Sequence, residues 1–64
     1  ERAGILASRT RAVRDQLAHY RTMHSLATGH GISWGALVTA ELIRRHEQEL
    51  TWLAELGELA KEEP

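Results

Sequence analysis

The residues with the clearest capacity for chemistry are four histidines, one of which opens a run that begins like a zinc-protease helix. The run His46-Glu47-Gln48-Glu49 matches the first half of an HExxH motif. That motif needs a second histidine one helical turn after the first, so that both rings reach one metal ion. Leu50 occupies that position. The run therefore predicts a histidine at a packed helix position rather than a metalloprotease site.

A structural metal site is the alternative for the same residues. His46 and Glu49 are three positions apart, which puts two potential ligands on one helix face. A third ligand would have to come from His19, His24 or His30. The sequence has no cysteine, and its histidines lack any recognised zinc spacing. We expect no metal and no cofactor.

Other catalytic patterns are also missing, so we do not expect an enzyme. The segment Gly29-His30-Gly31 does not follow a strand, as a phosphate-binding fingerprint would require. Ser25 and Ser33 have no histidine and third group at a recognisable spacing. Paired carboxylates would need a cleft to shift their pKa values, and a structure of two helices offers none of its own.

The second half of the sequence must form the element that positions His46 and its neighbours. From Ser33 to Lys61 there is no proline and many strong helix formers, which predicts one helix of roughly 28 residues. Its apolar positions form two adjacent stripes. The inner stripe consists of Ala36, Thr39, Ile43, His46, Leu50, Leu53, Gly57 and Ala60. The outer stripe consists of Val38, Leu42, Trp52, Leu56 and Leu59.

The two stripes together are too wide for a helix that packs on one neighbour. Such a helix needs an apolar stripe a little over ~100° wide, and this one covers nearly twice that. The helix is therefore expected to have a neighbour on each stripe. We expect Gly57, on the inner stripe, to let another backbone approach closely.

An earlier helix supplies the first neighbour. Its apolar positions recur at spacings of three, four and seven residues, at Leu6, Val13, Leu17, Tyr20, His24 and Ala27. We expect this helix near residues 8–28, a turn at 29–32 and the long helix near residues 33–62. Ser8 and Ser33 are the expected N-caps, and Gly29 is expected to adopt the left-handed conformation that closes a helix.

So short a link folds the two helices back on each other. The predicted fold is an all-α, antiparallel two-helix hairpin forming one domain over residues 1–64. Four residues are expected to hold the hairpin together: Leu17, Tyr20, Ile43 and Leu50. Because 64 residues bury little surface, the hairpin is expected to pair with a second copy into a dimeric helical bundle.

Charge is distributed unevenly along the sequence. Residues 1–30 hold five arginines against Glu1 and Asp15, whereas residues 31–64 hold seven glutamates against Arg44, Arg45 and Lys61. A basic half could bind nucleic acid, but no aromatic residue interleaves the arginines. We favour charge complementarity between two antiparallel helices.

Two further expectations concern the location of the chain and its relation to a longer protein. No apolar run approaches the ~18 residues of a membrane span, so we expect a cytoplasmic chain without membrane contact. Because the sequence opens at Glu1 rather than Met, we expect it to be part of a longer or processed chain.

The outer stripe is the candidate functional surface. Left in water it would be an association surface, and tryptophan is enriched at subunit interfaces. The expected dimer-interface residues are Val38, Leu42, Trp52, Leu53, Leu56 and Leu59. A second interpretation of Trp52 stays open, in which its ring forms a wall for a small planar aromatic ligand.

The same region resembles a known family. The segment Glu49-Leu50-Thr51-Trp52-Leu53-Ala54-Glu55-Leu56, after a Gly-Ile turn and within a long amphipathic helix, resembles the C-terminal domain of PadR-like transcriptional regulators. The earlier helix, with Gln16-Leu17-Ala18-His19-Tyr20-Arg21, fits the same family, and the likeness covers about residues 10–59.

The resemblance implies a role. PadR-like regulators are winged-helix DNA-binding proteins that dimerise through their C-terminal helices, and some bind small aromatic ligands near that interface. Trp52 matches the family's helix tryptophan. The winged helix is absent from this sequence, so DNA would be contacted only by a domain outside it. We therefore expect a dimerisation and effector-sensing module of such a regulator. The alternative is a stand-alone helical adaptor that docks a different protein on the outer stripe.

Overall fold

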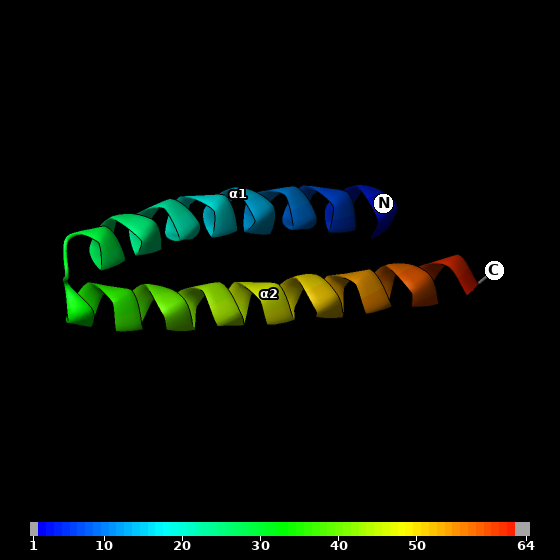
Figure 1. Ribbon diagram of the computed structural model, residues 1–64. Helices are drawn as coiled ribbons and strands as arrows, with labels where there is room; N and C mark the ends of the chain where they lie inside the picture. The colour runs from blue at the N-terminus through cyan, green and yellow to red at the C-terminus, as the bar shows by residue number, and fades with distance from the viewer. Residues whose placement is uncertain (1, 63–64) are drawn as a thin grey trace.

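Two long helices, joined by a tight turn, make up the computed structural model, which describes the backbone of residues 2–62 and the side chains of residues 4–62. Helix α1 spans Arg2–Gly29 and helix α2 spans Ser33–Glu62. They run antiparallel, with the two ends of the chain at the same end of the molecule (Figure 1). Glu1, Glu63 and the Arg2 side chain, counted among the charges above, lie outside the described part.

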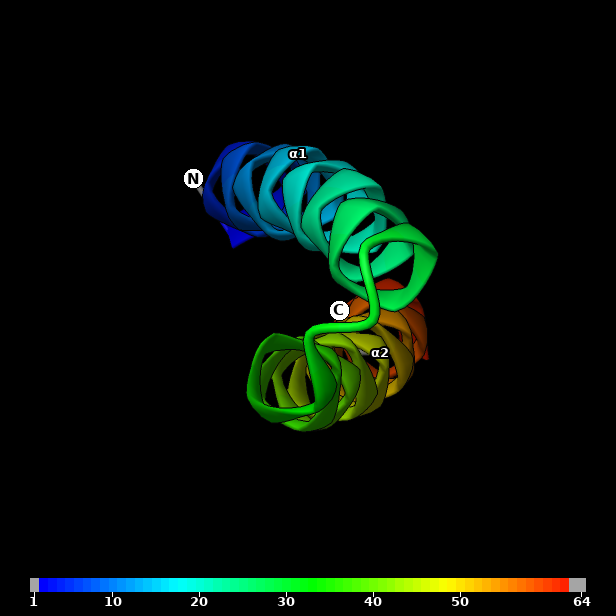
Figure 2. The ribbon, with the colours of Figure 1, turned by 60° about the vertical axis from the view of Figure 1, so that its left-hand side comes forward.

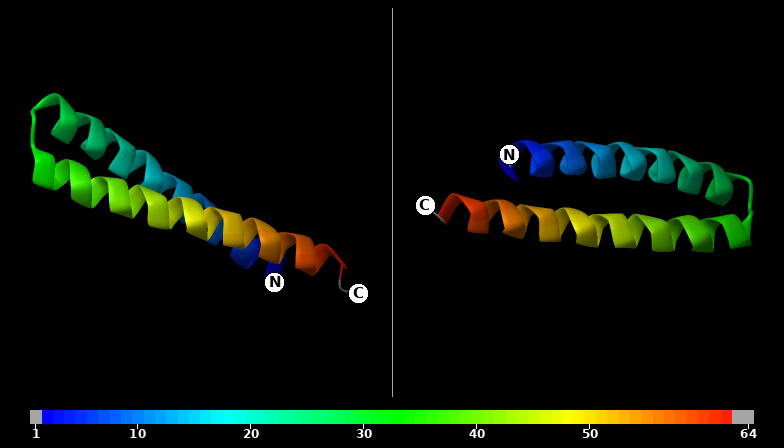
Figure 3. Two further views of the ribbon diagram at one scale, coloured as in Figure 1. Left: turned by 60° about the horizontal axis from the view of Figure 1, so that its bottom comes forward. Right: turned by 180° about the vertical axis from the view of Figure 1, so that it is seen from behind.

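The fold is the predicted all-α hairpin. It measures 52 × 15 × 11 Å, so it is a single layer of two helices with one contact face. The view from the turn shows α1 above α2 along their whole length (Figure 2). In the left panel of Figure 3 α1 passes behind α2, so the helices are inclined to each other rather than strictly parallel.

The bounds of α2 agree with the sequence, but α1 begins at Arg2 rather than near Ser8. Ser8 therefore lies within the helix and is not its cap. Gly4 disfavours a helix by about 1 kcal/mol relative to alanine. That cost is offset because Leu6 is half-buried and shares a groove with Gly57 and Ala60 of α2. The extra turns give Leu6 cover that a helix starting at Ser8 would not.

The core lies between the predicted inner faces. Val13, Leu17 and Ala27 of α1 are buried, and Thr39 and Leu53 of α2 are buried against them. All remaining members of the inner stripe are at least half-buried. Of the four residues expected to hold the hairpin, Leu17 is buried and Tyr20, Ile43 and Leu50 are half-buried.

The turn is a Schellman motif, and it places the left-handed residue at Gly31 rather than Gly29. Gly31 has φ 70°, and its N–H donates to the carbonyl of Thr28 at 3.2 Å. The N–H of Ile32 donates to the carbonyl of Ala27 at 2.8 Å, and this is the bond of the motif that spans more residues. Glycine suits this position because a side chain disfavours a positive φ.

The same turn corrects the expected cap of α2. The carbonyl of Ile32 accepts the N–H of Ala36 at 3.0 Å, which is the first hydrogen bond of the helix. Ile32 is therefore the N-cap, and Ser33 is the first helical residue. The helix starts where expected, but the orientation of the turn, not a serine hydroxyl, sets its start.

The expectation for Gly57 was wrong within the described residues. A Cβ built on Gly57 meets nothing within 4 Å. The close approach occurs instead at Gly35, where a Cβ would lie 3.3 Å from the Cβ of Ala27. Near the turn the helices are thus closest at a glycine that the stripe analysis did not include.

Candidate self-association surface

The outer stripe of α2 lies beside the face that packs on α1 and is only partly covered. Val38 is 39% exposed, Trp52 is 55% exposed and Leu59 is 56% exposed. Leu42 and Leu56, the other two members, are half-buried. This stripe therefore leaves large apolar side chains in contact with water along most of α2, which is unusual for a surface with no function.

Leu53 belongs elsewhere. It was expected at the dimer interface, but its side chain is 5% exposed and lies in the core of the hairpin. Its position on the helix explains this, because Leu53 is a member of the inner stripe. The structure therefore leaves five of the six expected interface residues on the free face of α2.

Two further apolar residues widen the free surface near the turn. Trp34 is 77% exposed and Leu37 is 69% exposed. Leu37 lines a shallow groove with Val38 and Leu42, bordered by the charged side chains of Glu41 and Arg45. The stripe analysis did not include Trp34 or Leu37, although their size and exposure could have been anticipated from their helix positions.

Charged residues divide the outer stripe into two apolar parts. The Nε of Arg45 donates to Glu41 Oε2 at 2.8 Å, and Arg44 donates to both oxygens of the same carboxylate. These hydrogen bonds, first from Arg44 and then from Arg45, lower the pKa of Glu41 to about 2. Glu41 is therefore ionised at any physiological pH and holds both arginines along the helix.

Glu49 also lies between the two apolar parts of the outer stripe, and its carboxylate connects α2 to α1. The Nε of Arg9 donates to Glu49 Oε2 at 2.6 Å across the hairpin. This hydrogen bond holds the pKa of Glu49 below its ordinary value. On the other side of the hairpin, Arg21 pairs with Glu47 at 2.9 Å. Basic α1 and acidic α2 thus complement each other, as the charge distribution predicts.

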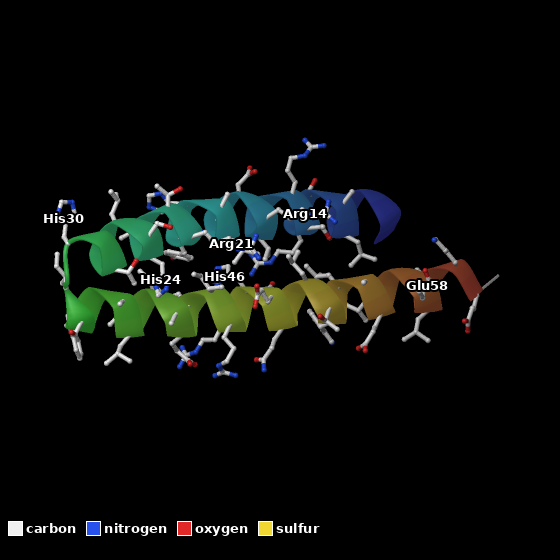
Figure 4. The ribbon with its side chains drawn as sticks, viewed as in Figure 1. Arg14, Arg21, His24, His30, His46 and Glu58 are labelled. Carbon is white, nitrogen blue, oxygen red and sulfur yellow. The ribbon has the colours of Figure 1, made fainter. Side chains whose placement is uncertain are left out.

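Two of the four histidines, His24 and His46, have partners within the hairpin. Figure 4 shows His24 and His46 between the helices and His30 at the turn. The Nδ1 of His46 donates to the carbonyl of Leu42 at 2.8 Å, and its Nε2 lies 3.0 Å from Oε1 of Gln16. The ring also meets Tyr20 edge-on, with centroids 5.1 Å apart. His46 is thus the packed helix histidine that the sequence favours.

His24 contacts Thr39, a pairing that was not predicted although both residues lie on the expected inner faces. Its Nδ1 lies 2.9 Å from Oγ1 of Thr39, whose hydroxyl is 2.7 Å from the carbonyl of Gly35. Because a carbonyl oxygen can only accept, the hydroxyl donates a hydrogen bond to the carbonyl of Gly35 and accepts one from the Nδ1–H of His24. This assigns the tautomer of His24 and explains why a threonine is buried at this point.

The described residues hold neither a cluster of metal ligands nor a membrane-spanning helix. Residues 2–62 contain no group of three histidine, aspartate or glutamate side chains placed to hold a metal ion. Neither helix, over the same residues, is long and apolar enough to cross a bilayer.

Comparison with known proteins gives no relative. No protein-family model, no curated protein and no solved structure matches the chain. Arguments about function therefore rest on the residues of the hairpin and on the contacts described above.

Proposed function

We propose that this hairpin is the dimerisation module of a DNA-binding transcriptional regulator similar to the PadR-like family. The observation that carries the proposal is the partly exposed outer stripe of α2, with Trp52 at 55% exposure on a helix whose other face is already covered by α1. An indole on such a surface is a typical anchor of a protein interface. DNA would be contacted by a domain outside this sequence.

The segment around Trp52 supports the family part of the proposal. Its sequence resembles the helix through which PadR-like regulators dimerise, and Trp52 lies on the free face of α2. Dimerisation would fix the distance between two DNA-binding heads on a two-fold operator. The proposal includes a cytoplasmic location, because the heads need access to DNA.

A fusion experiment tests this function. The hairpin is joined to a DNA-binding head that represses a reporter only when it is dimeric. We expect repression by the fusion, and loss of repression in a Trp52→Ala variant that is expressed at the same level. A stable fusion that leaves the reporter fully active would refute the proposal.

The exposed groove beside Leu37 favours one alternative, a helical adaptor that docks a different protein. An adaptor of this kind would be monomeric alone and would fail to dimerise the reporter head. Equilibrium sedimentation of the pure chain separates the two functions, since only the regulator module associates with itself.

A further inference from the structure

The outer stripe and the charged residues between its two parts form one heptad series. The spacing alternates between three and four residues over most of α2. The members of the series are Val38, Leu42, Arg45, Glu49, Trp52, Leu56 and Leu59. A regular repeat of this kind is the pattern of a helix that coils around another helix. The series covers about 32 Å of α2, at ~1.5 Å per residue.

The series is self-complementary when read in opposite directions. Its centre is a charged pair, Arg45 and Glu49, and apolar residues follow on both sides. We propose that α2 pairs antiparallel with α2 of a second copy, about a two-fold axis between Arg45 and Glu49. This inference rests on the proposed dimerisation and adds the direction and register of the pairing.

The proposed register pairs apolar residues with apolar residues on both sides of the charged centre. Val38 meets the partner's Leu56, and Leu42 meets the partner's Trp52. Gly35 packs against Ala27 of α1, so Leu59 lies at the edge of the contact, beyond the last apolar pair. In antiparallel coiled coils, the two core positions of the heptad face each other in this alternating way. Val38, Leu42, Trp52 and Leu56 are then each covered by an apolar residue.

The charged centre decides the direction. In the antiparallel register Arg45 faces the partner's Glu49 on both sides of the two-fold axis. In a parallel dimer, Arg45 would face the partner's Arg45, and Glu49 would face the partner's Glu49. Like charges would then meet in a partly dry interface. Charges without an opposite partner are strongly disfavoured there. The second copy is therefore expected to run antiparallel.

The same centre decides the register. Moving one copy by one heptad sets Arg45 against the partner's Leu56 and sets Glu49 against the partner's Trp52. Moving it the other way sets Arg45 against the partner's Leu42. Each shift buries a charge against an apolar side chain, which only the proposed register avoids.

The bonds already present in the hairpin leave room for these pairs. The bond from Arg9 uses Oε2 of Glu49, and a carboxylate has lone pairs on both oxygens. The bond from Arg45 to Glu41 uses Nε, and the terminal nitrogens of the guanidinium extend beyond it. Arg45 is 67% exposed at the side chain, so these nitrogens can reach across the axis.

Cysteine cross-linking tests the register, because the sequence has no native cysteine. Two single variants, Val38→Cys and Leu56→Cys, are oxidised with a glutathione buffer, separately and as a mixture. A disulfide needs Cα atoms within about 7 Å. We expect a cross-linked pair only in the mixture. Thr51→Cys, on the polar face of α2, is the control for random collision.

Three outcomes would overturn the proposal, and they differ in what else they refute. Rapid cross-linking of Val38→Cys alone means parallel pairing, and a dimer that forms no cross-link in the mixture means another register. In both cases the proposed dimerisation stands. A chain that stays monomeric at high concentration in equilibrium sedimentation refutes the dimerisation itself.

A charge exchange gives an independent test that introduces no cysteine. The double variant R45E/E49R keeps opposite charges across an antiparallel axis. It should therefore dimerise with itself, whereas dimers mixed with the wild type would bring like charges together. We expect native mass spectrometry to show few mixed dimers. A preference for mixed dimers would indicate parallel pairing of the two α2 helices and would overturn the proposal.

Discussion

Thr39 and His24 meet inside the hairpin, where Oγ1 of Thr39 accepts a hydrogen bond from Nδ1 of His24 at a distance of 2.9 Å. The two residues are fifteen positions apart and are brought together by the Schellman turn. Thr39 is 4% exposed and is the buried polar side chain in a core that is otherwise apolar over the described residues. Its contact with His24 joins α1 to α2 near the turn.

Replacing Thr39 by valine keeps the shape of the side chain but removes the acceptor for His24. We expect Thr39→Val to lower the free energy of unfolding by about 1 kcal/mol, measured by urea denaturation. Thr51→Val is the matched control, because Thr51 makes the same kind of bond to its own helix on an exposed face. Equal losses in both variants would contradict a role for the contact with His24.

The two glycines of α2 should respond differently to alanine. Gly57→Ala meets open space and removes backbone freedom from the unfolded chain, so we expect a gain of about 0.5–1 kcal/mol in stability. Gly35→Ala would bring its Cβ 3.3 Å from that of Ala27. We expect no gain there, and a loss if the helices cannot separate. Thermal unfolding followed by circular dichroism makes the comparison, and an equal gain at both positions would refute it.

The ion pair between Arg9 and Glu49 predicts a pH dependence. The pKa of Glu49 is lowered in the folded state, so the pair adds stability above the ordinary glutamate value of 4.5. That stability is lost as the pH falls through the lowered pKa. We expect Glu49→Gln to unfold at a lower temperature than the wild type at pH 7, and the difference to be smaller at pH 2 than at pH 7.

The control for this experiment is Glu55→Gln, which removes a charge from an exposed position of the same helix. It should show no such convergence. A Glu49→Gln variant whose deficit is the same at both pH values would show that the lost stability has a source other than the ionised carboxylate.

Trp52 is expected to be an anchor of the dimer. Trp52→Ala should weaken self-association by ~2 kcal/mol, which is about 30-fold in the dissociation constant. Leu26→Ala is the control, because Leu26 is 58% exposed on α1 and lies outside the heptad series. Sedimentation equilibrium gives both constants. A dimer constant that is unchanged in Trp52→Ala, or equally weakened in Leu26→Ala, would remove Trp52 from the interface.

Helical spacing was enough to predict the hairpin and its inner face. The inner stripe, from Ala36 to Ala60, was read from periodicity alone, and each of its members is buried or half-buried. The length of α2 followed from the run of strong helix formers without proline between Ser33 and Lys61. These features are local or repeat regularly, which is why one sequence is enough to find them.

Features that depend on tertiary packing could not be predicted in this way. The start of α1 depends on the cover that Leu6 finds beside Gly57, which local propensity does not contain. The left-handed residue is Gly31 rather than Gly29, because the relative placement of the helices selects one glycine of two. Leu53 was placed both on the inner stripe and at the interface, and its burial shows that the inner stripe was the correct assignment.

Equilibrium sedimentation of the unmodified chain determines whether a second copy covers the outer stripe of α2. We expect a species of twice the 7.2 kDa chain mass at micromolar concentration, with Trp52 protected from a soluble quencher relative to a dilute sample. A fully helical species of 7.2 kDa at every concentration, with unchanged quenching, would contradict it.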